Sequence, residues 1–203
     1  MKPRFLSIMS CAVVLLVCTY TANAKVAIGK PAPDFSITDA AGNTQTLSQY
    51  AGKVVVLEWT NHECPFTVKH YKTGNMQGLQ QRYTEQDVVW LSVISSAPGK
   101  QGHVSPEQAQ ELTESRKAEP SAVLLDQQGQ LGRLYEAKTT PHMFIVDGDG
   151  LLQYNGAIDS IRSADSADIE PATNYVASAL DALLANQPVE VSLTKPYGCS
   201  VKY

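Results

Sequence analysis

The chain has 203 residues with 16 basic and 20 acidic side chains, which gives a formal net charge of −4. A nucleic-acid-binding protein needs a clustered basic patch, and the sequence holds none, so we exclude nucleic acid as a partner. The length suits one domain with a hydrophobic core.

The first 24 residues have the pattern of a secretory signal peptide. Lys2 and Arg4 form a short basic head, an apolar stretch covers 12–17, and Ala22-Asn23-Ala24 is an A-x-A cleavage site. The apolar stretch is too short for a comfortable membrane span. The sequence therefore predicts a signal peptide at 1–24, a mature domain at 25–203 in the periplasm or outside the cell, and no integral membrane span.

The first half of the mature domain has an order of strands and helices that follows from its periodicity and turn residues. Prolines keep its start at 29–35 extended, because residues before proline avoid the helical region. The elements expected next are a short strand at 36–39 with its return at 44–47, a buried strand at 54–59, a helix from 65 to about 71, and a continuation to about 83 after an interruption at 73–75.

The second half begins with another strong strand. We expect this strand at 88–94, a long loop at 95–104, a helix from 105 to about 118, a strand at 122–125 and a short helix at 130–135. A strand from 141 to 146, a turn at 147–150 with its return at 151–154, and an amphipathic helix at 171–185 follow. Pro141 must open its strand, because proline cannot donate to a sheet ladder. The tail at 189–203 has no clear period. This order predicts an α/β sandwich in which a mixed sheet carries helices on both faces.

Cys64 occupies the most informative position in this pattern. It follows the buried strand and precedes Pro65, and proline suits the first helical position because its missing N–H would have no partner there. Cys64 is thus expected at or near the helix N-cap, where backbone N–H groups and the positive helix end stabilise an anion. A thiol there should have a lowered pKa and be more nucleophilic. The alternative is a buried cysteine that acts as a small hydrophobe or as half of a structural disulfide.

The cysteine count leaves one partner for Cys64. Cys11 and Cys18 lie in the expected signal peptide, so the mature domain keeps only Cys64 and Cys199. Two cysteines in an exported protein can pair, because disulfides persist in oxidising compartments. Their wide separation excludes a C-x-x-C redox motif and a zinc knuckle.

Several of these segments resemble a known family. The stretch from Gly29 to Phe35, the strand before Cys64, Thr140-Pro141 and the turn at 147–150 are similar to the thioredoxin-like fold. Within that fold, the match is to the alkyl hydroperoxide reductase/thiol-specific antioxidant (redoxin) family. The stretches Asn61-His62-Glu63-Cys64-Pro65-Phe66 and Pro196 to Lys202 resemble its peroxiredoxin-like branch.

The resemblance implies a thioredoxin-like three-layer sandwich and a thiol-based oxidoreductase with Cys64 as the attacking thiolate. Its substrate would be a peroxide or a disulfide, an external thiol would be the reductant, and no cofactor or metal is expected. The resemblance also implies that Pro141 is cis and that the Thr140 backbone faces Cys64. Cis bonds before proline are a minority, so this is a specific geometric prediction.

The residues upstream of Cys64 depart from the peroxiredoxin pattern P-x-x-x-T-x-x-C. Leu57 stands at the proline position and Asn61 at the threonine position, with Thr60 one place earlier. We assign Thr60 and Asn61 as supporting residues that either donate hydrogen bonds to a bound peroxide or sulfenate, or complete the turn.

Two roles are open for Cys199. As a resolving thiol, it would condense with a Cys64 sulfenic acid to form a disulfide, either within the chain or with a partner chain. As a permanent staple, a bridge that closes so long a loop could stabilise the fold by about 5 kcal/mol in the chain-entropy model. The second role would suit a non-enzymatic exported domain that presents a binding surface.

Other polar residues near Cys64 have weaker assignments. His62 and His142, together with the two thiols, could bind copper or zinc. Copper-delivery proteins of this fold usually carry two neighbouring cysteines, however, so we expect no metal. Lys69, His70 and Lys72 could raise the potential at Cys64, but we expect each on a solvated helix face.

Overall fold

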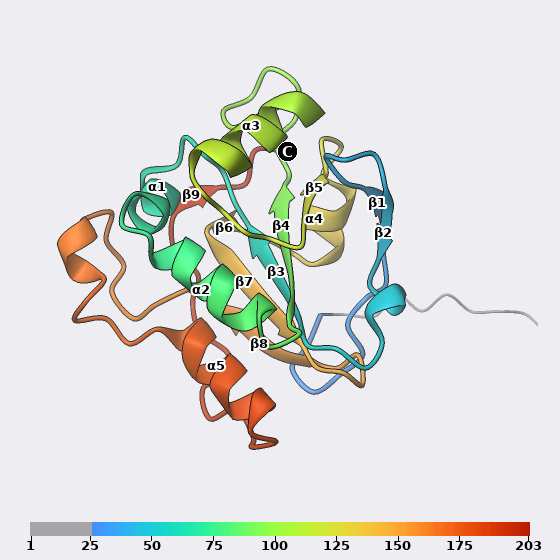
Figure 1. Ribbon diagram of the computed structural model, residues 1–203, viewed down its shortest axis with the longest axis vertical. Helices are drawn as coiled ribbons and strands as arrows, with labels where there is room; N and C mark the ends of the chain where they lie inside the picture. Colours follow the sequence, from blue (N-terminus) through green and yellow to red (C-terminus); the bar gives the residue numbers. More distant parts are fainter. Residues whose placement is uncertain (1–25) are drawn as a thin grey trace, which may run out of the picture.

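The computed structural model describes residues 26–203, so the predicted signal peptide lies outside the described residues (Figure 1). A five-stranded sheet in the order β5-β4-β3-β7-β8 forms its centre. The strands are β3 (Val55–Trp59), β4 (Val89–Ile94), β5 (Ala122–Leu125), β7 (His142–Val146) and β8 (Leu152–Gly156). β3, β4 and β5 are parallel, whereas β7 is antiparallel to both β3 and β8. The predicted mixed sheet is therefore confirmed.

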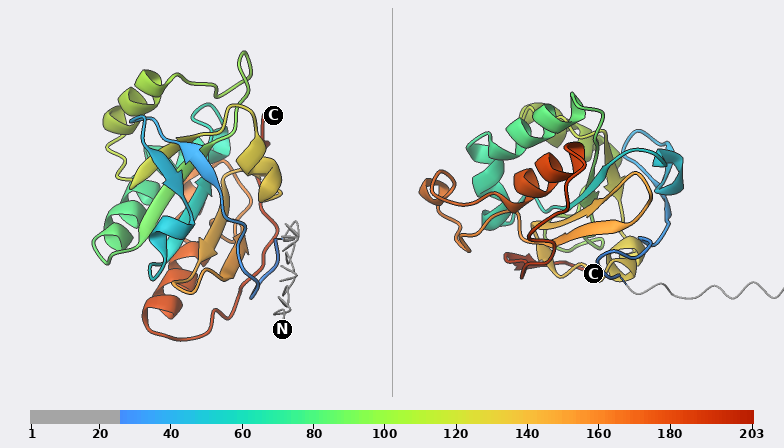
Figure 2. Two further views of the ribbon diagram at one scale, coloured as in Figure 1. Left: turned by 90° about the vertical axis from the view of Figure 1, so that its right-hand side faces the viewer. Right: turned by 90° about the horizontal axis from the view of Figure 1, so that it is seen from below.

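Helices cover both faces of this sheet, which makes three layers. One face carries α1 (Pro65–Lys72), α2 (Asn75–Thr84) and α5 (Tyr175–Leu184). The other carries α4 (Gln130–Leu134), the hairpin of β1 (Ser36–Thr38) and β2 (Thr44–Thr46), and the short helix η1 (Ser48–Tyr50). The left view of Figure 2 shows α2 and α4 on opposite sides of the sheet. The remaining elements are α3 (Pro106–Ser115), which packs beside β4 and β5, β6 (Thr139–Thr140), η2 (Ser166–Asp168) and β9 (Cys199–Ser200).

Alternation along β3 divides the core between these two faces. Successive side chains of a strand point to opposite faces. Val55, Leu57 and Trp59 accordingly pack on the α4 side, whereas Val56 packs against α2 and α5. All five residues of β3 are buried, so this strand is the central support for the turn that follows it.

Glu58 places a carboxyl group inside the core on the α1 and α2 side, which the sequence analysis did not anticipate. Its oxygens accept hydrogen bonds from Trp90 Nε1 and Tyr71 Oη (both 2.8 Å), Ser92 Oγ (3.0 Å) and Gln80 Nε2 (3.2 Å). Burial raises the pKa of Glu58, although the four donors oppose that shift. The carboxyl group thus joins β3, β4, α1 and α2 and fixes α1 against the sheet.

Most predicted elements are confirmed, with two corrections at their ends and one strand in the tail that was not predicted. α3 ends at Ser115 rather than near 118. α5 begins at Tyr175 rather than at Pro171, because Asn174 is its N-cap and accepts a hydrogen bond from the Ala177 N–H. The tail, in which the sequence shows no clear period, contains β9, which pairs with β6. No helix among residues 26–203 is long and apolar enough to cross a bilayer.

Candidate active site

The sheet brings the Cys64 turn and the Pro141 turn to the same edge. β3 ends at Trp59, which pairs with Val93 of β4 and with His142 of β7. Because β7 runs antiparallel to β3, the start of β7 lies beside the end of β3. The turn after β3 and the turn before β7 therefore meet, and these turns carry Cys64 and Pro141.

Cys64 is the N-cap of α1 and Pro65 occupies the first helical position, as predicted. The Cys64 carbonyl accepts hydrogen bonds from the N–H groups of Thr67 (2.9 Å) and Val68 (2.8 Å), which begin the helix. The Cys64 side chain is completely buried, and its Sγ donates to the Thr140 carbonyl oxygen at 3.0 Å. The Thr140–Pro141 peptide bond is cis. Both the cis bond and the Thr140 backbone facing Cys64 confirm the prediction.

The pairing of β6 with β9 brings Cys199 to the same place. Thr140 lies opposite Cys199 in this antiparallel pair, and the Thr140 carbonyl is the acceptor of the Cys64 thiol. The close approach requires Gly198, whose φ is +131° and where a Cβ would lie 2.1 Å from the Thr140 carbonyl oxygen. Both cysteines are free thiols, and Cys199 is partly exposed. Cys64 and Cys199, which are far apart in the mature sequence, are therefore brought to the same place within one chain.

The two thiols differ in their acidity. Burial raises the pKa of Cys64, but hydrogen bonds from the Cys199 thiol and from the N–H groups of Cys199 and Thr67 outweigh it, so the net pKa is lowered. Burial, reinforced by the neighbouring Cys64, raises the pKa of Cys199 to about 11. Because the thiolate is the nucleophile, this difference favours Cys64 as the attacking member of the pair.

We therefore expect Cys64 to be alkylated at a lower pH than an ordinary thiol, and Cys199→Ala to move this pH upward. The variant removes a thiol that stabilises the Cys64 thiolate, so the pKa of Cys64 should rise. Iodoacetamide labelling across a pH series, read for each cysteine by peptide mass, measures both midpoints. Cys199→Ser keeps a hydroxyl donor and serves as the matched control. An unchanged midpoint in Cys199→Ala would contradict this account.

The supporting residues of the sequence analysis differ in their hydrogen bonds. The hydroxyl groups of Thr60 and Thr140 are buried and have no protein hydrogen-bond partner. Thr67, which the sequence analysis missed, has the same property and lies three residues after Cys64. The Asn61 amide is fully engaged instead: its Oδ1 accepts from the Glu63 N–H (2.9 Å), and its Nδ2 donates to the Gln101 carbonyl (3.2 Å). Asn61 thus completes the turn and ties it to the 95–104 loop.

The surroundings of the histidines do not indicate a metal site. His142 Nε2 donates to Asn155 Oδ1 (2.8 Å), and its Nδ1 accepts the Lys138 N–H (3.2 Å), so both ring nitrogens are occupied. Burial lowers the pKa of His142 to about 4. His62 lies apart from it and lines a groove of about 430 Å³ with residues of α1 and α3, next to Arg116. Within residues 26–203, no three His, Cys, Asp or Glu side chains gather as metal ligands would.

One expectation about α1 was wrong. Lys69 and His70, predicted on a solvated face, are buried, and only Lys72 of the three is exposed. A buried charge needs a partner. Lys69 finds one in Asp159, 3.4 Å away between Nζ and Oδ2. No local pattern indicated this pair, because the two residues lie far apart in the sequence.

Comparison with known proteins agrees with this geometry. Residues 28–155 match the sequence profile of the AhpC/TSA family. The chain belongs to the AhpC/TSA family. This AhpC/TSA protein is 28% identical over 152 residues to the thiol-disulfide oxidoreductase ResA of Geobacillus kaustophilus (strain HTA426), a match covering 74% of the chain and 82% of ResA.

Solved structures show the same architecture. An uncharacterized conserved protein from Geobacillus kaustophilus superposes with a TM-score of 0.72 at 25% identity, covering 89% of this chain and 94% of the other. A hypothetical protein from Sinorhizobium meliloti 1021 has the same TM-score at 22% identity, covering 88% and 96%. A putative thiol:disulfide interchange protein DsbE from Chlorobium tepidum has a TM-score of 0.54 at 24% identity, covering 77% and 99%. The thioredoxin-like fold of this AhpC/TSA protein is thus confirmed, and its family supports a thiol-dependent redox function.

Proposed function

We propose that this AhpC/TSA protein is an exported thiol-dependent oxidoreductase that cycles between a dithiol and a Cys64–Cys199 disulfide. The observation that carries the proposal is the β6–β9 pairing, which sets Cys199 opposite the residue whose carbonyl accepts the Cys64 thiol. The pattern of residues 1–24 supports export, with 25–203 as the mature domain in the periplasm or outside the cell.

The burial of Cys64 favours a small hydroperoxide as the oxidant. The Cys64 side chain has no exposed surface, so a bulky disulfide reaches it only if the tail moves, whereas a peroxide is compact. The Cys64 thiolate attacks the terminal peroxide oxygen, the O–O bond breaks, and a sulfenic acid and an alcohol or water result after proton uptake. Cys199 then attacks the sulfenic sulfur, which forms the disulfide and releases one water molecule.

Cys64 and Cys199 differ in exposure and acidity, and this difference determines how the disulfide is reduced. Cys199 is the partly exposed member of the pair, so an external thiolate attacks there and forms a mixed disulfide. Cys64 leaves as the thiolate, and a thiol of lower pKa is the better leaving group. A second external thiol completes the reduction and restores the Cys199 thiol.

We assign the buried hydroxyl groups of Thr60 and Thr140 to hydrogen bonding with the peroxide or sulfenate oxygen. Both lack a protein partner, and a buried hydroxyl is costly to leave unpaired. Asn61 acts by holding the turn, and Pro141 by presenting the Thr140 backbone to Cys64.

Treatment of the reduced protein with one equivalent of hydrogen peroxide, or of oxidised glutathione, tests the proposal. Peptide mass mapping follows Cys64 and Cys199 separately from the two cysteines near the N-terminus. We expect peroxide to consume both thiols together and to yield an intramolecular disulfide faster than glutathione does. Faster reaction with the disulfide would make disulfide reduction the function. If both oxidants consume the Cys64 and Cys199 thiols only as fast as an ordinary free cysteine, the result would indicate a structural bridge in a non-enzymatic domain.

A further inference from the structure

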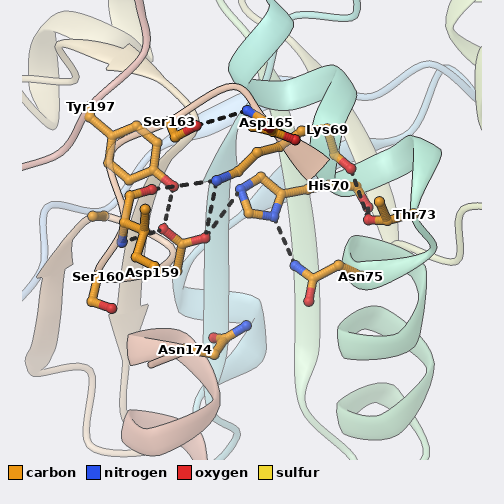
Figure 3. A network of polar contacts seen from close by, with 12 residues as sticks. Lys69, His70, Thr73, Asn75, Asp159, Ser160, Ser163, Asp165, Asn174 and Tyr197 are labelled. Carbon is orange, nitrogen blue, oxygen red and sulfur yellow. Dashed lines mark hydrogen bonds and ion pairs between the residues drawn. The ribbon is translucent and has the colours of Figure 1, made fainter. Parts of the chain in front are cut away.

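A buried polar cluster connects α1 to the tail that carries Cys199. Figure 3 shows Lys69 and His70 of α1, Asp159 from the segment after β8, and Tyr197 of the tail pointing toward one another. We call these four residues the tail anchor. Each has at most 3% of its surface exposed. Lys69 Nζ lies 3.4 Å from Asp159 Oδ2, and the Tyr197 hydroxyl donates to Asp159 Oδ1.

Asp159 carries the carboxylate that the other three residues of the tail anchor face. Asn75 Nδ2 donates to His70 Nδ1 (2.8 Å), which leaves His70 Nε2 facing Asp159 Oδ2 at 3.7 Å. Burial and the charge of Lys69 lower the pKa of His70 to about 3, so His70 is neutral. Lys69 is therefore the cation that compensates the Asp159 carboxylate. Removal of one member of a buried ion pair is strongly destabilising, so this pair fixes the position of the carboxylate.

The Tyr197 ring is seated on the helix that begins at Cys64. It packs edge-to-face against Phe66, with ring centroids 5.9 Å apart, and Lys69 Nζ lies 5.5 Å from its centroid. Phe66 is two residues after Cys64, and Tyr197 is two residues before Cys199. An extended chain advances about 3.3–3.6 Å per residue, so only a short tether separates the anchored ring from the Cys199 thiol.

We propose that Tyr197 is a positioning residue whose hydrogen bond to Asp159 holds Cys199 at Cys64 for disulfide closure. This role rests on the proposed cycle, in which Cys199 attacks the oxidised Cys64. Anchoring on α1 fixes Cys199 relative to the attacking cysteine itself, because Cys64 is the N-cap of that helix. Loss of the hydrogen bond frees the tail and lowers the effective concentration of Cys199 at Cys64, while Cys64 keeps its place at the helix N-cap.

The variant Tyr197→Phe tests this inference, because it keeps the ring contacts and removes only the hydroxyl. The reduced protein is equilibrated with buffers of reduced and oxidised glutathione. Cys64 exchanges with oxidised glutathione to give a mixed disulfide and one glutathione thiol. Cys199 then displaces the second glutathione and closes the ring. The ratio of closed to mixed disulfide at a fixed concentration of reduced glutathione measures closure, and we expect it to fall about tenfold, as one lost hydrogen bond to a charged group implies.

Tyr83→Phe is the matched control. Tyr83 is also fully buried, and its hydroxyl donates to an aspartate, Asp181 Oδ1, at 2.9 Å, but it joins α2 to α5 away from the tail. It should lower the unfolding free energy without changing the closure ratio. The inference is overturned if Tyr197→Phe closes like the wild type, or if Tyr83→Phe lowers the ratio equally.

Alkylation of Cys199 in the reduced protein separates this inference from the proposed function. A wild-type protein that forms no Cys64–Cys199 disulfide would refute the proposed cycle. The tail anchor is still measured in that case, because iodoacetamide should label Cys199 about tenfold faster in Tyr197→Phe than in the wild type or in Tyr83→Phe, as loss of the same hydrogen bond implies. Equal labelling of Cys199 in the three proteins would overturn the anchor itself.

Discussion

In a Cys64→Ser variant, peroxide or glutathione disulfide is expected to oxidise the remaining thiol, Cys199, at least about a hundredfold more slowly than the two thiols of the wild type. Cys199 is then the only thiol there, and burial raises its pKa. A thiol whose pKa is raised by burial is less ionised at neutral pH and therefore a poorer nucleophile. The measurement is site-resolved thiol loss after one equivalent of oxidant.

Cys199→Ser is the informative counterpart. It keeps Cys64 and its helix N-cap, so the first attack should persist, while the disulfide cannot form. The product with peroxide should be a Cys64 sulfenic acid, which a second equivalent of peroxide oxidises to the sulfinic acid or which added thiol converts to a mixed disulfide with release of water. If Cys64→Ser reacted as fast as the wild type and Cys199→Ser did not react, the assigned roles of the two cysteines would be reversed.

Gly198→Val is expected to lower the stability of the Cys64–Cys199 disulfide by about a hundredfold or more. A Cβ at this position would lie 2.1 Å from the Thr140 carbonyl oxygen and 2.8 Å from its carbon, and both are backbone atoms that cannot move aside easily. The backbone there also has a φ of +131°, which β-branched residues avoid. β9 should therefore leave β6 and carry Cys199 away from Cys64. Equilibration with glutathione buffers measures the change.

Gly42→Ala is the control for backbone strain alone. Gly42 has a φ of +85°, and no atom lies within 4 Å of the place that a Cβ would occupy. This variant should lower the unfolding free energy by about 1 kcal/mol and leave the disulfide equilibrium unchanged. An equal loss of disulfide stability in both variants would show that the contact with Thr140 does not position Cys199.

The centre of the site could be predicted from sequence because its signals are local. A β-branched strand, a cysteine and a proline at the first helical position define the N-cap within a few residues. The cis bond was implied by the resemblance to the redoxin family, to which Thr140-Pro141 before an apolar strand contributes. Parallel and antiparallel pairing of the strands then brings both turns to one edge without further information.

The placement of Cys199 could not be derived from the tail itself. β9 has only two residues, which is too short to show a period, and its pairing depends on a glycine that permits contact with a distant carbonyl. The start of α5 was misplaced for a related reason. Pro171 suits the first position of a helix, but the side chain of Asn174 supplies the cap.

The buried charges were missed because charge on a helix usually indicates solvent. Lys69 is buried only because Asp159 and the Ile161 carbonyl lie beside its ammonium group. Glu58 is buried only because four donors from three other elements surround it. Partners so distant in sequence leave no periodic signal in the segment that they neutralise.

The reduction potential of the Cys64–Cys199 disulfide tests the central claim most directly. Equilibration of the protein in glutathione buffers, with each cysteine read by mass, gives this value. Hydrogen bonds stabilise the Cys64 thiolate and hence the reduced state, so we predict a potential between about −270 and −120 mV, the range of redox-active pairs. A potential below about −300 mV, typical of structural disulfides, would show that the bridge is a staple and would contradict the proposed cycle.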